Sequence, residues 1–120
     1  MSFAILLMFA FSMHAQDELT SNLYETYENY KESSIGKRRI KHADIQPLIQ
    51  KFKANPKFEV QKVGESIQGR DLHLISIGSG DSNIFLWSQM HGDEPTATQA
   101  IFDILNFLDA PEFNEEKEAI

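Results

Sequence analysis

The sequence feature that most constrains the fold is an apolar run followed by a polar loop and an amphipathic segment. Four apolar residues open Ile84–Gln89, which predicts a mostly buried strand. Pro95–Leu108 predicts a helix, because its apolar side chains recur at helical spacing. These side chains are Ala97, Ile101, Leu105 and Leu108. A strand followed by a loop and a helix favours an α/β fold, in which such loops commonly hold ligands and catalytic groups.

The loop between these segments carries a candidate metal-binding pair. His91 and Glu94 stand three positions apart in the run HGDEPTAT, and an imidazole with a carboxylate suits zinc. The pair alone is a weak motif, since about 0.4 such pairs are expected by chance in a chain of this composition. The alternative is structural: Asp93 caps the helix, Glu94 favours its dipole and Pro95 sets its first turn.

A second motif precedes the loop. Lys62–Gly78, KVGESIQGRDLHLISIG, resembles the opening hairpin of the zinc carboxypeptidase family, peptidase family M14, with its G-x-S-x-x-G-R turn. The H-x-x-E loop follows at the interval usual in that family, and the resemblance covers about Phe58–Leu108. It implies an α/β fold that starts a mixed β-sheet flanked by helices, of which this chain holds an incomplete part.

The resemblance also assigns roles to the loop. It implies that His91 and Glu94 are two of three protein ligands to a catalytic Zn²⁺, which keeps an open position for water. In the family a histidine from a later segment is the third ligand. The general-base glutamate and the arginines that bind the substrate carboxylate also come later. We therefore assign no catalytic residue here, and we expect the chain to be a truncated fragment of the domain.

The function implied is that of a zinc metallocarboxypeptidase, which hydrolyses C-terminal residues from peptide or protein substrates. One alternative is a related zinc amidohydrolase that acts on acyl amino acids or cell-wall peptides. Another is an inactive binding module or remnant, for which the missing third ligand is the direct sequence feature. The preferred C-terminal side chain and the oligomeric state are not determined by these residues.

The remaining histidines and one serine fit structural roles. His73 belongs to the predicted strand Leu72–Ile77, His42 precedes a short helix, and His14 belongs to the N-terminal leader. Ser66 lies in a predicted turn, Gly64–Gly69, and lacks the sequence context of a nucleophilic serine. None of these side chains is predicted to complete the metal site.

The N-terminus indicates export. Phe3–Phe11 is a run of nine apolar residues, which resembles a secretory signal peptide with cleavage after Ala15. The alternative is a buried N-terminal strand. The run is too short to span a bilayer, so we expect no stable membrane insertion. The predicted division is a signal peptide over residues 1–15 and an M14-type portion over residues 16–120, in a secreted or periplasmic protein.

Net charge and composition exclude some classes of binding partner and of catalytic chemistry. The formal net charge of −7 and a pI near 5.0 argue against a nucleic-acid partner, which calls for a basic surface. The chain has no cysteine, so it contains no disulfide and no cysteine ligand or nucleophile. The short cluster Lys37–Arg39 is expected to border helices, with a phosphate or acidic-substrate contact as the alternative.

The middle of the chain predicts two helices and a hairpin. Asp17–Glu32 and Asp44–Phe52 each place apolar side chains on one helical face, and Asn55-Pro56 ends the second helix. From Phe58, alternating residues predict a half-buried strand that pairs with Leu72–Ile77. The strand at Ile84 would then need further sheet neighbours.

Overall fold

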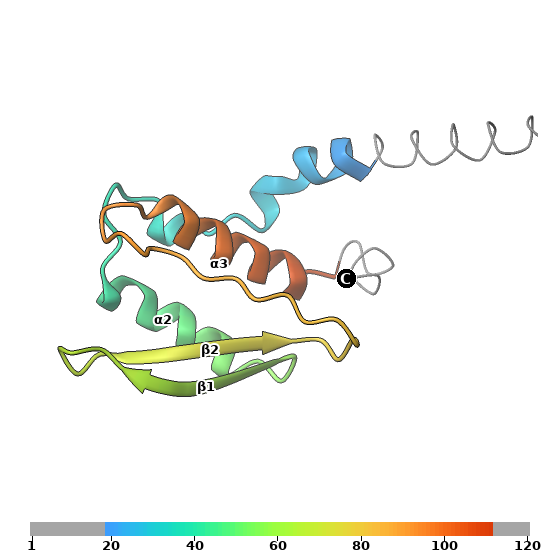
Figure 1. Ribbon diagram of the computed structural model, residues 1–120. Coiled ribbons are helices and arrows are strands. Elements are labelled where there is room, and N and C mark those ends of the chain that lie inside the picture. Colours follow the sequence, from blue (N-terminus) through green and yellow to red (C-terminus); the bar gives the residue numbers. More distant parts are fainter. Residues whose placement is uncertain (1–18, 112–120) are drawn as a thin grey trace, which may run out of the picture. The chain divides into compact units, whose positions relative to one another are not determined.

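The structure is a computed structural model that describes residues 19–111 of the 120-residue chain (Figure 1). The chain divides into two compact units, residues 1–31 and 32–120. The predicted signal peptide, residues 1–15, lies outside the described residues, as do residues 112–120. Among residues 19–111, no helix has the length and apolarity needed to cross a membrane.

The described part of the first unit, residues 19–31, contains one helical segment. Residues 19–26 are α-helical and a 3-10 turn, η1, follows at Tyr27–Asn29. The prediction of an α-helix that continues to Glu32 is therefore wrong at its C-terminal end. The backbone N–H groups of Tyr30 and Lys31 both donate to the carbonyl of Tyr27, at 3.2 and 3.0 Å, which tightens the last turn and ends the helix.

The described part of the second unit, residues 32–111, contains two longer helices and one hairpin (Figure 1). Its elements in chain order are η2 Ser33–Ile35, α2 His42–Lys53, β1 Phe58–Glu65, β2 Asp71–Ile77 and α3 Thr96–Asp109. Helix α2 begins two residues before the predicted Asp44, because the Asp44 carboxylate accepts a hydrogen bond from the backbone of Lys41 at 2.8 Å. This contact places Asp44 in the first turn, where a carboxylate also favours the helix dipole.

The predicted hairpin is confirmed. Strands β1 and β2 pair antiparallel, with Phe58 opposite Ile77, and the register shifts between Lys62 and Gly64. Ser66 belongs to the turn, where its backbone N–H donates to the Arg70 carbonyl at 2.8 Å. The turn ends through a glycine at positive φ, Gly69 at 67°, a conformation that glycine adopts without steric cost.

Lys62 lies at the register shift of the hairpin and joins the two strands next to the turn. Its ammonium contacts the carboxylates of Asp71 and Glu65, the former at 2.8 Å. The hydrogen bond to Asp71, and then that to Glu65, raises the pKa of Lys62 to about 12. Both pairs are solvent-exposed, so they contribute little to stability.

The predicted strand Ile84–Gln89 does not form, and its predicted burial is wrong. The segment is extended but has no strand pairing, and the sheet contains β1 and β2 alone among the described residues. Its apolar side chains are exposed, with Phe85 at 67% and Trp87 at 62%. A strand requires a neighbouring backbone for its hydrogen bonds, and the described residues supply none. The α/β class is confirmed in a small fold that leaves this segment unpaired.

The core of the second unit is centred on Phe52, whose side chain is fully buried. Its ring lies 4.8 Å from that of Phe58 in β1, at a steep angle, and 6.2 Å from that of Phe102 in α3, nearly parallel. Buried aliphatic side chains complete the cluster around it. They are Ile35, Ile40, Leu48 and Leu105. Two ring contacts of Phe52 therefore join α2 to β1 and to α3, and α3 packs through Phe102 and Leu105.

A buried carboxylate, Glu32, ties the start of the second unit to α3. Its backbone N–H donates to Asp103 Oδ1 at 2.6 Å, and its own carboxylate accepts from Ser34 and from Asn106. Burial raises the pKa of Glu32, but the hydrogen bonds from Ser34 and Asn106 and the charge of Lys51 outweigh burial and lower it. The ionised form of Glu32 is therefore favoured in the folded chain.

We predict that Phe52→Ala lowers the free energy of unfolding by about 3–5 kcal/mol, because it removes a fully buried ring and leaves a cavity. Phe85→Ala is the matched control. Its ring is exposed, and we expect a change within about 0.5 kcal/mol. Urea unfolding followed by circular dichroism measures both. Equal effects of the two substitutions would contradict the central position of Phe52.

We also predict that Glu32→Gln lowers the free energy of unfolding by about 1 kcal/mol at neutral pH. The folded-state pKa of Glu32 is lowered, so its stabilisation is full above the ordinary value of 4.5 and is lost as pH falls through the folded-state value. The difference between wild type and variant should therefore shrink in acid. Unfolding at a series of pH values tests this, with exposed Glu25→Gln as control. A difference that grows in acid would contradict the prediction.

Candidate metal centre

The two predicted ligands lie together on the loop that leads into α3. The loop turns back because the backbone N–H of Glu94 donates to the carbonyl of His91 at 3.2 Å. Their side chains then converge, and His91 Nδ1 lies 3.1 Å from Glu94 Oε2. Both side chains are about two-thirds exposed, at 70% and 67%. The loop therefore presents one nitrogen and one oxygen donor side by side to solvent.

The spacing of these two atoms suits zinc. Zn–N and Zn–O bonds of about 2.0–2.2 Å in a tetrahedral arrangement place two donor atoms about 3.3–3.6 Å apart. The separation of His91 Nδ1 and Glu94 Oε2 is 3.1 Å, which is that of a hydrogen bond, so both atoms could bind one ion after losing the shared hydrogen and moving apart by a few tenths of an ångström. The donor set, a neutral imidazole and a carboxylate, is also one that zinc accepts. The pair fits two positions of a zinc site.

The other histidines lie elsewhere. His42 is the first residue of α2, where its Nε2 contacts the Asp71 carbonyl at 3.3 Å and the Gln46 amide at 3.1 Å. His73 stands on β2 opposite Lys62, with a buried Nδ1 that has no hydrogen-bond partner within residues 19–111. His14 lies outside the described residues. In the described part of the chain, no three His, Cys, Asp or Glu side chains form a group that could hold a metal.

The predicted alternative for Asp93, a helix N-cap, is wrong. Helix α3 begins at Thr96 with Pro95 as its N-cap residue, because residues 92 and 93 form a turn that spaces Asp93 away from the helix. The carbonyl of Pro95 accepts from the Gln99 backbone N–H at 3.1 Å. Glu94 stands immediately before the N-terminal end of α3, which is favourable for a carboxylate.

Gln89 is an interacting residue that the sequence reasoning missed. Its φ is 56°, a left-handed conformation that costs a residue other than glycine about 1–2 kcal/mol. Its side-chain nitrogen donates to the carbonyls of Ile40 and Gly92, at 3.2 and 3.1 Å. Its oxygen accepts from the hydroxyl of Thr98 at 2.8 Å. The sequence carries one sign of this role: Ser88 and Gln89 are polar and stand directly after an apolar run.

Thr98 connects this amide to α3. The residue is buried, with 6% of its surface exposed. It gives its single hydroxyl hydrogen to Gln89, so Ser88 must be the donor in the 2.8 Å contact between the two hydroxyls. Ser88 therefore donates to Thr98, and Thr98 donates to Gln89. The chain of hydrogen bonds joins the loop to a buried position of the helix.

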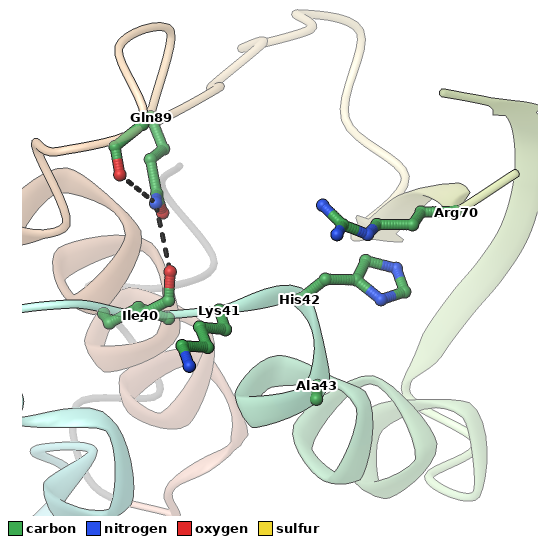
Figure 2. A pocket seen from close by; sticks show the side chains of 7 residues that line it. Ile40, Lys41, His42, Ala43, Arg70 and Gln89 are labelled. Atoms are coloured by element: carbon green, nitrogen blue, oxygen red, sulfur yellow. Dashed lines mark hydrogen bonds between the residues drawn. The ribbon is translucent and has the colours of Figure 1, made fainter. Parts of the chain in front are cut away.

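Gln89 lines two open hollows. One, of about 590 Å³, is bordered by the loop that carries His91 and Glu94 and by Trp87 of the extended segment before it. The other, of about 480 Å³, is bordered by the start of α2, by Arg70 of the hairpin turn and by Gly92. Figure 2 shows the Arg70 guanidinium beside the His42 ring, with the Gln89 amide across the hollow. The loop that carries His91 and Glu94 is thus open to solvent and borders the larger of these two hollows.

The chain belongs to the zinc carboxypeptidase family: the model of peptidase family M14 matches residues 45–119, more than half of its length. The match includes most of α2, the hairpin and the loop with His91 and Glu94. The resemblance drawn from the hairpin and the H-x-x-E motif is confirmed. The family places the protein among the peptidases, a class of hydrolases. The chain has no significant match among curated proteins or among solved structures.

We predict that the fluorescence of Trp87, the single tryptophan of the chain, resembles that of free tryptophan in water. Its side chain is 62% exposed beside the metal loop, so acrylamide should quench it strongly in the folded chain. Emission spectra and quenching before and after unfolding test this. A blue-shifted, protected emission from the folded chain would show that Trp87 is buried, as the predicted strand required.

Proposed function

We propose that this protein is a zinc metallocarboxypeptidase that hydrolyses C-terminal residues from peptides, with His91 and Glu94 as two of its zinc ligands. The observation that carries the proposal is the convergence of His91 Nδ1 and Glu94 Oε2 at 3.1 Å on an open loop. That loop lies inside the segment that matches the zinc carboxypeptidase family. Geometry, donor chemistry and family thus support the same site.

The exposure of the pair suits catalysis. A hydrolytic zinc site uses three protein ligands and leaves one position for water, so its metal must face an open space. The two side chains are 70% and 67% exposed and border the 590 Å³ hollow. The third ligand is proposed to come from outside residues 19–111. The general base and the groups that hold the substrate carboxylate are proposed to come from there as well.

The roles of the two residues follow from their donor atoms. When bound, zinc polarises the scissile carbonyl and lowers the pKa of the attacking water. His91 would hold it through an unprotonated Nδ1, and Glu94 through an ionised carboxylate, which offsets one of its two positive charges. Each ligand must be free of its proton, so zinc affinity should fall as the solution is acidified.

Export is part of the proposal. The apolar run Phe3–Phe11, with the small residue Ala15 after it, supports a signal peptide over residues 1–15. The M14-type portion would then be residues 16–120, in a secreted or periplasmic protein. The proposed substrates, free C-terminal ends of peptides, are available outside the cell.

We predict that His91→Ala, made in the protein as its gene encodes it, lowers zinc affinity by at least about 100-fold, since it removes a direct ligand. Hydrolysis of a peptide with a free C-terminal carboxylate should be lost as well. His73→Ala is the matched control, because His73 lies on β2 away from the pair, and it should keep zinc and activity. Metal analysis after dialysis and a hydrolysis assay measure both. Zinc and activity retained by the His91 variant would contradict the assignment.

The same assay separates the alternatives. A carboxypeptidase cleaves the free peptide and spares the same peptide with an amidated C-terminus. Cleavage of acyl amino acids or cell-wall peptides instead would favour the related zinc amidohydrolases. Zinc binding with no hydrolysis of any of these substrates would favour a binding module.

A further inference from the structure

We infer that Gln89 is a positioning residue, whose side chain holds the loop of His91 and Glu94 in the geometry that binds the metal. The inference rests on the proposed zinc site and adds a residue to it that neither contacts the metal nor belongs to the H-x-x-E motif. Gln89 stands two residues before His91, at the point where the chain leaves the extended segment and turns toward α3.

The contacts of the side chain link three segments. The amide nitrogen uses both hydrogens, one to the carbonyl of Ile40 before α2 and one to that of Gly92 inside the loop, at 3.2 and 3.1 Å (Figure 2). The amide oxygen accepts from Thr98 in α3 at 2.8 Å. A glutamine amide has two hydrogens to donate, and here one of them binds the loop residue that lies between the two ligands.

Two of the residues that bind the Gln89 amide, Ile40 and Thr98, are buried and so have fixed positions. Ile40 and Thr98 are each 6% exposed, and Ile40 belongs to the apolar cluster around Phe52. Gly92, in contrast, is exposed. The Gln89 amide therefore links an exposed turn, through Gly92, to two buried residues that hold the turn in place. Without the amide, the turn would keep the His91–Glu94 contacts but would lose the hydrogen bond at Gly92 that ties it to Ile40 and Thr98 through Gln89.

The backbone of Gln89 supports the same inference. Its φ of 56° is one that glycine adopts freely and glutamine does not. A glycine here would remove the strain but would also remove the amide. Strained residues persist where the surrounding structure holds them, and they cluster at functional sites. At this position, the three side-chain hydrogen bonds are what hold the strained conformation.

The expected effect follows from how outer residues act on metal sites. Groups that orient direct ligands typically change metal affinity by about 10–100-fold when they are removed. Gln89→Ala should therefore weaken zinc binding by about 10-fold or more, while His91 and Glu94 are both still present. In the metal-free protein, the backbone of residues 89–94 should become mobile on the fast timescale that NMR order parameters report.

Two measurements on the protein as its gene encodes it test this. The first is the zinc dissociation constant, by competition with a chelating dye. The second is the set of backbone ¹⁵N order parameters for residues 89–94 without metal, which should fall from about 0.85 in wild type toward 0.6 in Gln89→Ala. Gln46→Ala is the matched control, since Gln46 is also a half-buried glutamine with a side-chain hydrogen bond, to His42 at 3.1 Å. It should change neither quantity.

A pair of substitutions at Thr98 separates positioning from packing. Thr98→Val keeps the shape of the buried side chain but removes the hydroxyl that donates to Gln89, and it should weaken zinc binding. Thr98→Ser keeps the hydroxyl and removes a buried methyl group. It should bind zinc like wild type even though it is less stable. Thermal unfolding of each variant confirms that it is folded at the temperature of the zinc titration.

The outcomes distinguish this inference from the proposed function. If Gln89→Ala is folded and its order parameters and zinc affinity equal those of wild type, Gln89 does not position the loop. If Thr98→Ser loses as much zinc affinity as Thr98→Val, packing and not the hydroxyl is responsible, and the inference is wrong. If the order parameters fall as expected but wild type and His91→Ala bind zinc equally, Gln89 still holds the loop and the proposed zinc site is wrong.

Discussion

The second unit depends on the packing of one aromatic side chain, Phe52. Among the described residues, the Phe52 ring packs against Phe58 of β1 and Phe102 of α3. Helix α2 presents it because Leu48, Ile49 and Phe52 recur at helical spacing and are all buried. This contact gives α3 its place relative to the hairpin. The start of α3 is where the candidate metal loop ends.

The loop itself is held by polar contacts rather than by the apolar core. The Gln89 amide connects it to Ile40 and Thr98, which the core and α3 keep in place. The two predicted ligands then project from an exposed turn toward solvent. This division is common at functional sites, where a rigid scaffold positions residues on a surface loop. It also explains how a small core can support a defined pair of donors.

Local sequence patterns predicted the elements whose structure is determined by near neighbours. The alternation from Phe58, with turn residues up to Gly69, predicted the hairpin, and the apolar spacing after Pro95 predicted α3 to within one residue. The strand at Ile84–Gln89 was wrong because strand pairing depends on partners distant in sequence, which no local pattern reports. Gln89 was missed for a similar reason. Glycine is the usual sign of positive φ, and here a glutamine takes that conformation through contacts with Ile40 and Thr98.

The central claim is that His91 Nδ1 and the Glu94 carboxylate bind the same zinc ion. Long-range ¹H–¹⁵N NMR of the histidine rings during a zinc titration tests it most directly, because a metal bound to a ring nitrogen changes the resonance of that nitrogen. We expect the His91 Nδ1 resonance to shift with zinc, those of His42 and His73 to stay unchanged, and Glu94→Gln to reduce the His91 response. A His91 ring that is unaffected by zinc, or a response centred on His42 or His73, would contradict it.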